Sequence, residues 1–248
     1  VRGFSFVEAV ETLMGKVAVM PTLTVKPKQS EKPKILLLPD KSKTTDKIRE
    51  YLFRRGIDGM IADECIKKGV IFESLPYHNI VFVGFDENKK PKYAAFRATN
   101  SRRILGDCSG SDKHYSFRLA DSESNEVHLF ECAIDLLSYA TLSKLSGKDW
   151  RKENLVSLAG VYLPKEKIED STTPAAVIKY LTDRPDIQKI HIHFDNDNAG
   201  RKATQALKVI LPKRYEIFDE PPKKGKDYND YLCIQLGIWK SKERNFER

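Results

Sequence analysis

The C-terminal half of the sequence alternates between short apolar stretches and amphipathic stretches of about ten residues. The apolar stretches are EVHLFECA, NLVSLAGV, KIHIHFDN and RYEIFDEP, and a helical pattern such as IDLLSYATLSKL or PAAVIKYLTD follows each of them. Near-continuous apolar strands separated by helices are typical of a parallel sheet covered on both faces. We therefore expect an α/β domain, with a parallel sheet flanked by helices, over residues 126–240.

A different pattern precedes this domain. Two helical segments, TTDKIREYLFRRGID and ADECIKKGVIF, each reach a glycine that stops the helix, Gly56 and Gly69. The stretch NIVFVGFDENKKPKYAAFRAT then reads as a β-hairpin with DENKKP as its turn, and further strands are expected in ILGDCSG and HYSFRLA. We expect a smaller α+β domain over residues 35–125.

Both ends of the chain differ from these domains. A short helix in FSFVEAVETLMG precedes a linker rich in proline and lysine, so residues 1–34 are predicted to be a helix and linker, and residues 241–248 a tail. The chain opens with Val1, which is consistent with a fragment of a longer protein.

Charge and cysteine usage narrow the functional classes. The net charge is +8 with a pI near 9.1, which favours a polyanionic partner, most often nucleic acid. The four cysteines form no C-x-x-C pair, so neither a zinc knuckle nor a disulfide framework is predicted. The sequence also has no run of about 18 apolar residues of the kind that a spanning helix needs. We expect a cytoplasmic protein with reduced thiols and no membrane partner.

Carboxylates follow several of the predicted parallel strands. Because the carboxyl ends of such strands meet at one edge of the sheet, these side chains are expected to lie together. Mg²⁺ prefers oxygen ligands and needs only a few carboxylates, and Mn²⁺ is able to substitute for it. The candidate metal ligands are Glu131, Asp135, Asp195, Asp197, Asp227 and Asp230.

The spacing of Asp195 and Asp197 favours a metal shared by the two carboxylates. Alternate residues at a strand end point to the same side, so the two carboxylates are placed to share a metal. The alternative is that Asp195 only ends a strand and Asp197 only caps the next helix. Glu131, at the equivalent place in another strand, favours the metal interpretation. Asp230 is equally well explained as a cap of a turn.

These motifs resemble a known domain. A strand ending in FECAID, a strand ending in FDNDNAGRKA and the acidic segment GKDYND are similar to the Toprim domain, the Rossmann-like metal-binding fold shared by bacterial-type DNA primases, topoisomerases and some nucleases. Residues 36–119 resemble the domain of unknown function that precedes a Toprim-like domain in primase-like proteins of mobile elements. FSFVEAVETLMG is similar to the tail of the zinc-binding domain that starts such primases, so the zinc ligands would lie upstream and zinc is not expected in this fragment.

The resemblance implies roles for individual residues. Glu131 matches the Toprim glutamate that acts as general acid and base in nucleotidyl transfer, and Asp195 and Asp197 match the pair that coordinates magnesium. Asp135, Asp227 and Asp230 would be supporting ligands. The chain departs from the primase pattern at Cys132, where glycine is usual.

Basic residues around the same edge are candidates for phosphate contacts, because cations beside a metal neutralise phosphate together with it. Most surface lysines are only solvated, so each of these residues has that alternative. The candidates are Arg97, Arg103, Lys113, Arg118, Arg201, Lys202 and Lys226.

Two histidines, His191 and His193, alternate along the third strand and resemble ligands in their spacing. They precede Asp195 within the strand, where they would point into a layer covered by helices. We expect them to have a structural role.

The resemblance implies a magnesium-dependent, primase-like nucleotidyltransferase that acts on single-stranded DNA with nucleoside triphosphates, in the replication or transfer of a mobile element, with a helicase or relaxase as a further partner. A Toprim nuclease that cleaves DNA or RNA would use the same carboxylates. A third alternative, from another class, is a non-catalytic DNA-binding module, which the intact acidic set disfavours.

Overall fold

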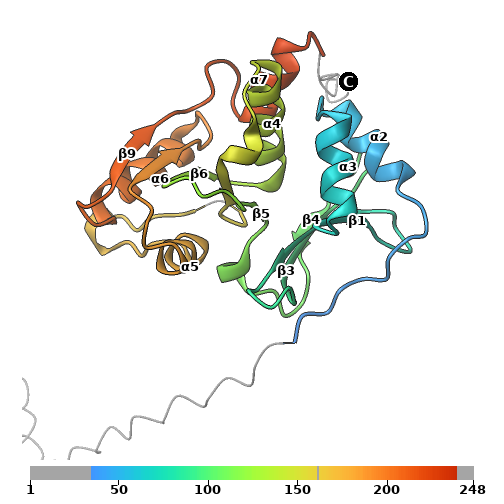
Figure 1. The fold of residues 1–248 in the computed structure, drawn as a ribbon, viewed down its shortest axis with the longest axis horizontal. Coiled ribbons are helices and arrows are strands. Elements are labelled where there is room, and N and C mark those ends of the chain that lie inside the picture. Colours follow the sequence, from blue (N-terminus) through green and yellow to red (C-terminus); the bar gives the residue numbers. More distant parts are fainter. Residues whose placement is uncertain (1–34, 161, 239–248) are drawn as a thin grey trace, which may run out of the picture. The chain divides into compact units, whose positions relative to one another are not determined.

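The computed structural model describes residues 35–160 and 162–238, which contain two β-sheets. The sequence segments expected at residues 1–34 and 241–248 lie outside the described residues. The first sheet is antiparallel, in the order β1-β2-β3-β4, and consists of β1 (Ile71–Glu73), β2 (Ile80–Phe85), β3 (Pro91–Arg97) and β4 (Leu105–Asp107) (Figure 1). The second, in the order β5-β7-β6-β8-β9, consists of β5 (Arg118–Leu119), β6 (Glu126–Phe130), β7 (Asn154–Ser157), β8 (Lys189–Ile192) and β9 (Glu216–Asp219).

The two helices before the first sheet form where the sequence predicts them. They are α2 (Asp46–Arg54) and α3 (Gly59–Lys67). Gly56 and Gly69 follow them with φ of 74° and 72°, a backbone conformation that glycine adopts without steric penalty. The Asp58 side chain caps α3 by accepting hydrogen bonds from the backbone N–H groups of Met60 and Ile61. The predicted hairpin is also present, as β2 and β3.

The second sheet has the predicted parallel strands. β6 pairs in parallel with β7 and β8, and β8 pairs in parallel with β9. The strand expected in HYSFRLA, β5, joins this sheet rather than the first one, because it pairs antiparallel to β7 with Leu119 opposite Leu155. Both side chains are buried in the core beside this sheet. The α/β fold class with a smaller antiparallel sheet before it is confirmed.

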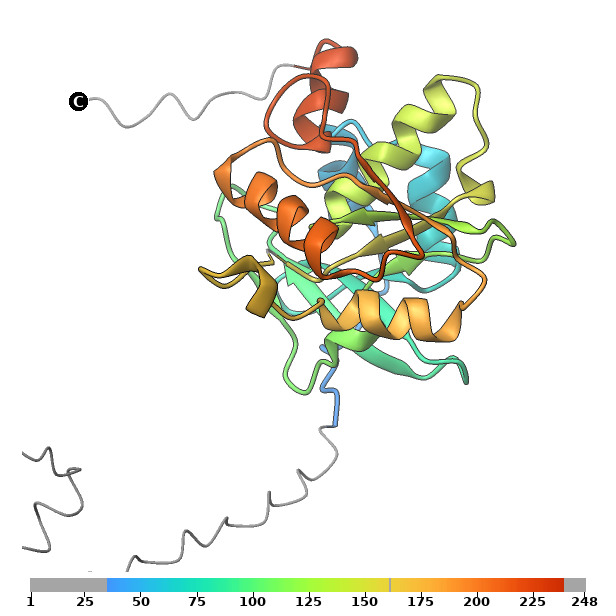
Figure 2. The same cartoon turned by 90° about the vertical axis from the view of Figure 1, so that its left-hand side faces the viewer.

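Helices cover both faces of the parallel sheet. One face packs on α5 (Ala175–Asp183) and α6 (Asn198–Ile210), which lie on the near side in Figure 2. The strands turn Val127, Ile190 and Ile192 to this side. The alternate residues face α4 (Ala133–Leu145) and α7 (Tyr228–Gln235), as the period of two in a strand requires.

One hydrophobic core joins the two sheets. Leu52 of α2, Ile61 of α3 and Phe82 of β2 belong to the same buried cluster as Phe130 of β6 and Leu137 of α4. The antiparallel sheet and the parallel sheet therefore stabilise each other through shared burial of apolar surface. In the described part of the chain, no helix is long and apolar enough to cross a membrane.

Gly84 in β2 provides a test of how closely the segment before β5 packs on the first sheet. A Cβ added there would lie 1.5 Å from the carbonyl oxygen of Tyr115, so Gly84→Ala forces the backbone apart. We expect a loss of about 3 kcal/mol in the free energy of unfolding, measured by urea denaturation. Gly59→Ala is the matched control, since nothing lies within 4 Å of its Cβ position. Equal denaturation midpoints for the two variants would contradict this packing.

Candidate metal-binding and catalytic site

The parallel pairing of β6 with β8 brings two predicted site residues together. Glu131 follows the last residue of β6, and Asp195 lies three residues beyond the end of β8. The backbone N–H of Asp195 donates a hydrogen bond to Glu131 Oε1 at 3.1 Å. Both side chains therefore lie at the carboxyl edge of the sheet, where the topology of an open parallel sheet gathers functional groups.

The two aspartates of the D-x-D segment face one cation. Lys226 Nζ lies 3.2 Å from Asp195 Oδ2 and 3.1 Å from Asp197 Oδ2. Asp197 is also the N-cap of α6, where its Oδ1 accepts a hydrogen bond from the Gly200 N–H at 2.9 Å. Asp197 therefore caps the helix through Oδ1, while its Oδ2 and that of Asp195 contact the same ammonium group. A metal shared by the two aspartates stays a prediction.

Gly200 lets the helix begin so close to the strand. A Cβ at this position would lie 2.1 Å from the carbonyl oxygen of Asp195. A larger residue would push α6 away from the strand end and separate the two aspartates. The small residue after the D-x-D segment is therefore a requirement of the close approach.

Burial and like charge determine the proton affinity of this site. Burial, then Asp195 and Asp197, raise the pKa of Glu131 to about 7. Burial also raises the pKa of Asp195, whereas the Gly200 N–H lowers that of Asp197. The two aspartates raise the pKa of Lys226. A carboxyl group that titrates near neutral pH is suited to accept and return a proton.

Asp135 lies in the first turn of α4, the helix that follows β6 and Glu131. It is buried, and it accepts hydrogen bonds from the Cys132 thiol at 2.9 Å and from the Asn229 N–H at 3.3 Å. Burial, followed by the charge of Asp227, raises the pKa of Asp135 to about 7. The Asn229 side chain in turn donates to Ser138 Oγ at 3.0 Å. Asp135 therefore fastens α4 to α7 beneath the site.

Asp227 and Asp230 shape the loop that carries Lys226. Asp227 is the N-cap of α7 and accepts a hydrogen bond from the Asp230 N–H at 2.6 Å. Asp230 Oδ2 accepts one from the Lys226 N–H at 3.1 Å. The charge of Asp227 also contributes to the raised pKa of Asp195, so this carboxylate lies within electrostatic reach of the site.

The carboxylates fit a hard divalent cation. Asp195 and Asp197 offer oxygen ligands to one point, and the Lys226 ammonium now supplies the positive charge there. Among the described residues, the sets of three ligand atoms that lie within 4.8 Å of one another contain histidines, and neither set includes Glu131. A metal held by Glu131 and both aspartates would therefore displace the Lys226 ammonium and draw the three carboxylates closer.

Two of the predicted phosphate-binding residues contact the carboxylates and the backbone of the site itself. Lys226 pairs with both aspartates, as described. Arg201 Nη1 donates to Asp219 Oδ1 at 2.6 Å, and its Nε and Nη2 donate to the carbonyl oxygens of Asp195 and Phe194 at 3.3 and 3.0 Å. Arg201 thus fixes the backbone just before the D-x-D segment.

The other basic candidates lie in different surroundings. Lys113 Nζ donates to the carbonyl oxygen of Ala159 at 2.9 Å, beside Gly160, whose N–H donates to the Glu131 carbonyl oxygen. Arg97 lines a mostly apolar cavity with Cys132. Arg118 is partly buried, and its guanidinium donates to the carbonyl oxygen of His114. Arg103 and Lys202 are exposed, as is Lys113.

Sequence reasoning missed the roles of Cys132, Asn229 and Lys226. In the sequence, Cys132 stood out only because glycine is usual at its position, yet its thiol donates a hydrogen bond to the Asp135 carboxylate. The segment GKDYND contains Asn229, but only its acidic residues were singled out. The pairing of Lys226 with the D-x-D segment depends on a loop that follows β9, and no local pattern reveals it.

Comparison with known proteins identifies two domains in the chain. Residues 128–232 match the family model described as Toprim-like, and residues 50–123 match the model of a protein family of unknown function, DUF3991. The predicted succession of these two domains is confirmed. An uncharacterized protein of Bacillus anthracis, pXO2-78, is 27% identical over 197 residues, which are 70% of this chain and 49% of that protein. The chain therefore spans about half the length of this curated relative.

Solved primase structures share the fold. The Escherichia coli primase catalytic core has a TM-score of 0.51 and 14% identity, and the match covers 78% of this chain and 70% of that one. A DnaG primase catalytic domain bound to single-stranded DNA also has a TM-score of 0.51 and 14% identity, over 78% of this chain and 71% of that one. At such identity the likeness concerns the fold alone, and it agrees with the Toprim-like arrangement of sheet and helices.

The raised pKa of Glu131 predicts a gain of stability in Glu131→Gln. Glutamine still accepts the Asp195 N–H but carries no charge. The folded wild type has a Glu131 pKa of about 7, against a usual value of 4.5, so it loses stability as the pH rises through this interval. We expect the variant to be more stable at pH 8 by about 1–2 kcal/mol, with no difference near pH 4.5.

Urea denaturation in the presence of a chelator, at several pH values, measures this difference. Glu216→Gln removes an exposed carboxylate from β9 and is the matched control. Wild-type and Glu131→Gln stabilities that run parallel from pH 4.5 to 8 would show that Glu131 is not under electrostatic strain.

Proposed function

We propose that the chain is a magnesium-dependent, primase-like enzyme that transfers nucleotides on single-stranded DNA, in the replication or transfer of a mobile element. The observation that carries the proposal is the convergence of Asp195 and Asp197 on one cation beside Glu131, whose pKa lies near neutral pH. The Toprim-like family match and the shared fold with primase catalytic cores support it.

Each of these residues has a defined task in the proposed reaction. Asp195 and Asp197 would hold Mg²⁺, with Mn²⁺ as a substitute, and the metal would supply charge neutralisation for the phosphates. Glu131 would take the proton from the attacking hydroxyl, because its carboxylate is buried and its proton affinity suits general-base action at neutral pH. Arg201 would keep the Asp195 backbone in position.

Lys113 is the basic candidate with the most direct connection to this edge. It contacts the Ala159 backbone just beyond the end of β7, next to the Gly160 N–H that donates to the Glu131 carbonyl oxygen. Its ammonium also lies 3.3 Å from Asp107 Oδ2, so it bridges the two sheets. Lys113, with the exposed Arg103 and Lys202, would contact the DNA backbone or the triphosphate.

The partners in this proposal are single-stranded DNA and nucleoside triphosphates, and one structural neighbour is a primase domain bound to single-stranded DNA. The net charge of +8 favours such a polyanion. A helicase or relaxase partner stays a prediction.

The lengths of labelled products test the reaction. The chain is incubated with a labelled single-stranded oligonucleotide, nucleoside triphosphates and Mg²⁺. We expect extended or newly synthesised strands from the wild type, and at least about a 100-fold lower rate from Asp195→Asn/Asp197→Asn, because the metal ligands are lost. The exposed pair Glu169→Gln/Asp170→Asn is the charge-matched control.

The same gel separates the alternatives. If the labelled strands become shorter, and this shortening depends on Asp195 and Asp197, the activity is that of a nuclease and not nucleotide transfer. Binding of the oligonucleotide with neither product would overturn the enzymatic proposal in favour of a DNA-binding module.

The position of Lys226 yields a further prediction for the metal site. Its ammonium competes with a metal for both aspartates, so Lys226→Met should bind Mg²⁺ more tightly, by about fivefold if one partly exposed ion pair of about 1 kcal/mol is removed. Calorimetric titration at fixed salt measures the change. Lys224→Met, an exposed neighbour in the same loop, is the control for lost charge. Unchanged or weaker Mg²⁺ binding in Lys226→Met alone would show that the metal does not occupy this position.

A further inference from the structure

We propose that single-stranded DNA binds at one end of the antiparallel sheet, where a base stacks on Tyr77 and phosphate groups contact Arg102 and Arg103. This surface consists of the β1–β2 loop, residues 74–79, and the β3–β4 loop, residues 98–104, and we call it the loop surface. Single-stranded DNA is the partner in the proposed function, on which this site therefore rests. The site adds where the strand is held.

The two loops lie together because the sheet is antiparallel. β1 ends and β2 begins at the same end of the sheet at which β3 ends and β4 begins. The Thr99 hydroxyl donates to the His78 carbonyl oxygen at 2.9 Å, which joins one loop to the other. The Ala98 N–H donates to the Ile104 carbonyl oxygen at 2.8 Å, so the second loop turns back on itself. Residues of both loops therefore belong to one surface.

Contacts from the interior hold the first loop in a fixed conformation. The buried Glu73 carboxylate accepts hydrogen bonds from two backbone N–H groups at the start of α2, and it also contacts the His78 imidazole. His78 has a φ of 53°, in the left-handed region, and a residue stays there only where its surroundings fix it. Tyr77 thus lies on an ordered loop, which lowers the entropy cost of binding a ligand.

The loop surface exposes apolar and aromatic side chains. Tyr77 is 76% exposed, Leu75 39% and Ile104 51%. Leu105, the first residue of β4, is 59% exposed beside them in the chain. Large apolar side chains that gather on an exposed surface mark a binding site, and an aromatic ring among them is a platform on which a nucleic-acid base stacks.

The cations of the loop surface are not neutralised by carboxylates. Arg102 and Arg103 are exposed, and in the described part of the chain neither guanidinium group forms an ion pair. Residues 74–79 and 98–104 also contain no aspartate or glutamate. Apolar side chains beside unpaired guanidinium groups match the bases and phosphates that alternate in a single strand.

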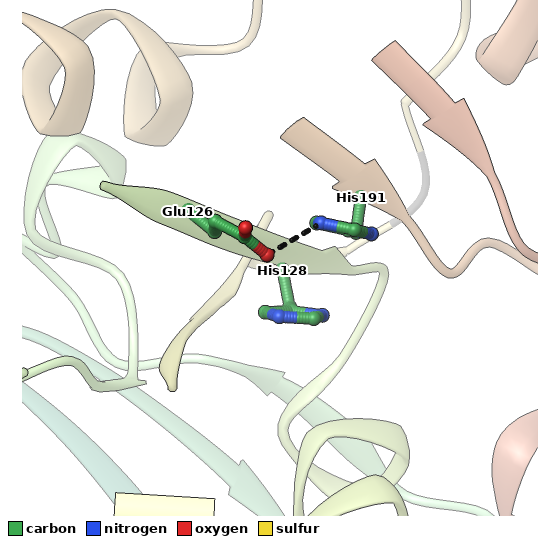
Figure 3. Close-up of side chains that lie close together, drawn as sticks. All are labelled: Glu126, His128 and His191. Atoms are coloured by element: carbon green, nitrogen blue, oxygen red, sulfur yellow. Dashed lines mark hydrogen bonds and ion pairs between the residues drawn. The ribbon is translucent and has the colours of Figure 1, made fainter. Parts of the chain in front are cut away.

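The histidines of the parallel sheet differ from these arginines, because they contact partners within the fold. His191 Nε2 lies 3.1 Å from Glu126 Oε2, and the His191 ring stacks on His128 with centroids 4.5 Å apart (Figure 3). Glu126 also pairs with Lys189 at 2.8 Å. These groups are paired inside the domain, whereas the guanidinium groups of the loop surface face solvent.

The loop surface lies beside the carboxyl edge of the parallel sheet. Arg97 and Leu105, which flank the second loop as register partners, line the cavity that Cys132 also lines. Cys132 follows Glu131 directly in the chain. A strand that stacks on Tyr77 and passes the two arginines therefore reaches the neighbourhood of Glu131.

Fluorescence anisotropy tests the site on the whole chain, with a labelled oligothymidylate of about 15 nucleotides and a chelator that prevents reaction. We expect Tyr77→Ala to bind about tenfold more weakly, because the stacking platform is lost. Tyr77→Phe keeps the ring and should bind like the wild type. An abasic strand of the same length offers no base to stack, so the wild type and Tyr77→Ala should bind it equally.

Salt dependence separates stacking from charge. Arg102→Gln/Arg103→Gln should lower the slope of log affinity against log salt by about 1–2, because up to two phosphate contacts are lost. Tyr77→Ala should leave this slope unchanged. Lys165→Gln/Lys167→Gln removes two exposed charges from another segment and is the matched control, which should keep the wild-type slope.

A wild-type chain that binds neither strand would overturn the site and leave the loop surface to a protein partner. Equal affinity of the wild type and Tyr77→Ala for oligothymidylate, or an equal loss on the abasic strand, would overturn the stacking contact. An unchanged slope in the arginine variant would overturn the phosphate contacts. The expected binding pattern without extended or shortened strands on the gel would refute the proposed enzyme and leave this site in place.

Discussion

The parallel pairing of β6 and β8 is the constraint on which the candidate site depends. It sets the end of one strand beside the end of the other, so that the Asp195 N–H reaches Glu131 Oε1 at 3.1 Å. A change of register would separate these residues, because neighbouring positions in a strand point to opposite faces. The close approach at Gly200 then starts α6 directly after Asp197. Local backbone geometry thus brings carboxylates together although their negative charges repel one another.

That concentration opposes stability in the absence of a cation. The pKa values of Glu131 and Asp135 rise to about 7, chiefly because both carboxyl groups are buried. Lys226 offsets part of the repulsion between the aspartates, because its ammonium group lies within 3.2 Å of both carboxylates. Catalytic sites often lower the stability of the folded state in this way, because carboxylates clustered to bind a cation repel one another when no cation is bound.

The same strand contributes to the carboxylate site and to a group of histidines on the face of the sheet that α4 and α7 cover. β8 directs His191 and His193 toward α4 and α7, and its extension carries Asp195. The segment after β9 lies beside both, since the Glu220 carboxylate contacts His191 and His193 and Lys226 contacts the D-x-D segment.

The sequence by itself determined the elements and their order. Strand and helix periodicity predicted the parallel sheet, the hairpin and the two helices before it, because these patterns reflect local burial and backbone preference. It also placed Glu131, Asp195 and Asp197 at strand ends. Only the tertiary structure decided that β5 joins the second sheet, that Arg201 and Lys226 serve the site's own carboxylates and backbone, and that Glu220 faces the histidines. These contacts join segments far apart in the chain, and their distances arise from packing that no local pattern encodes.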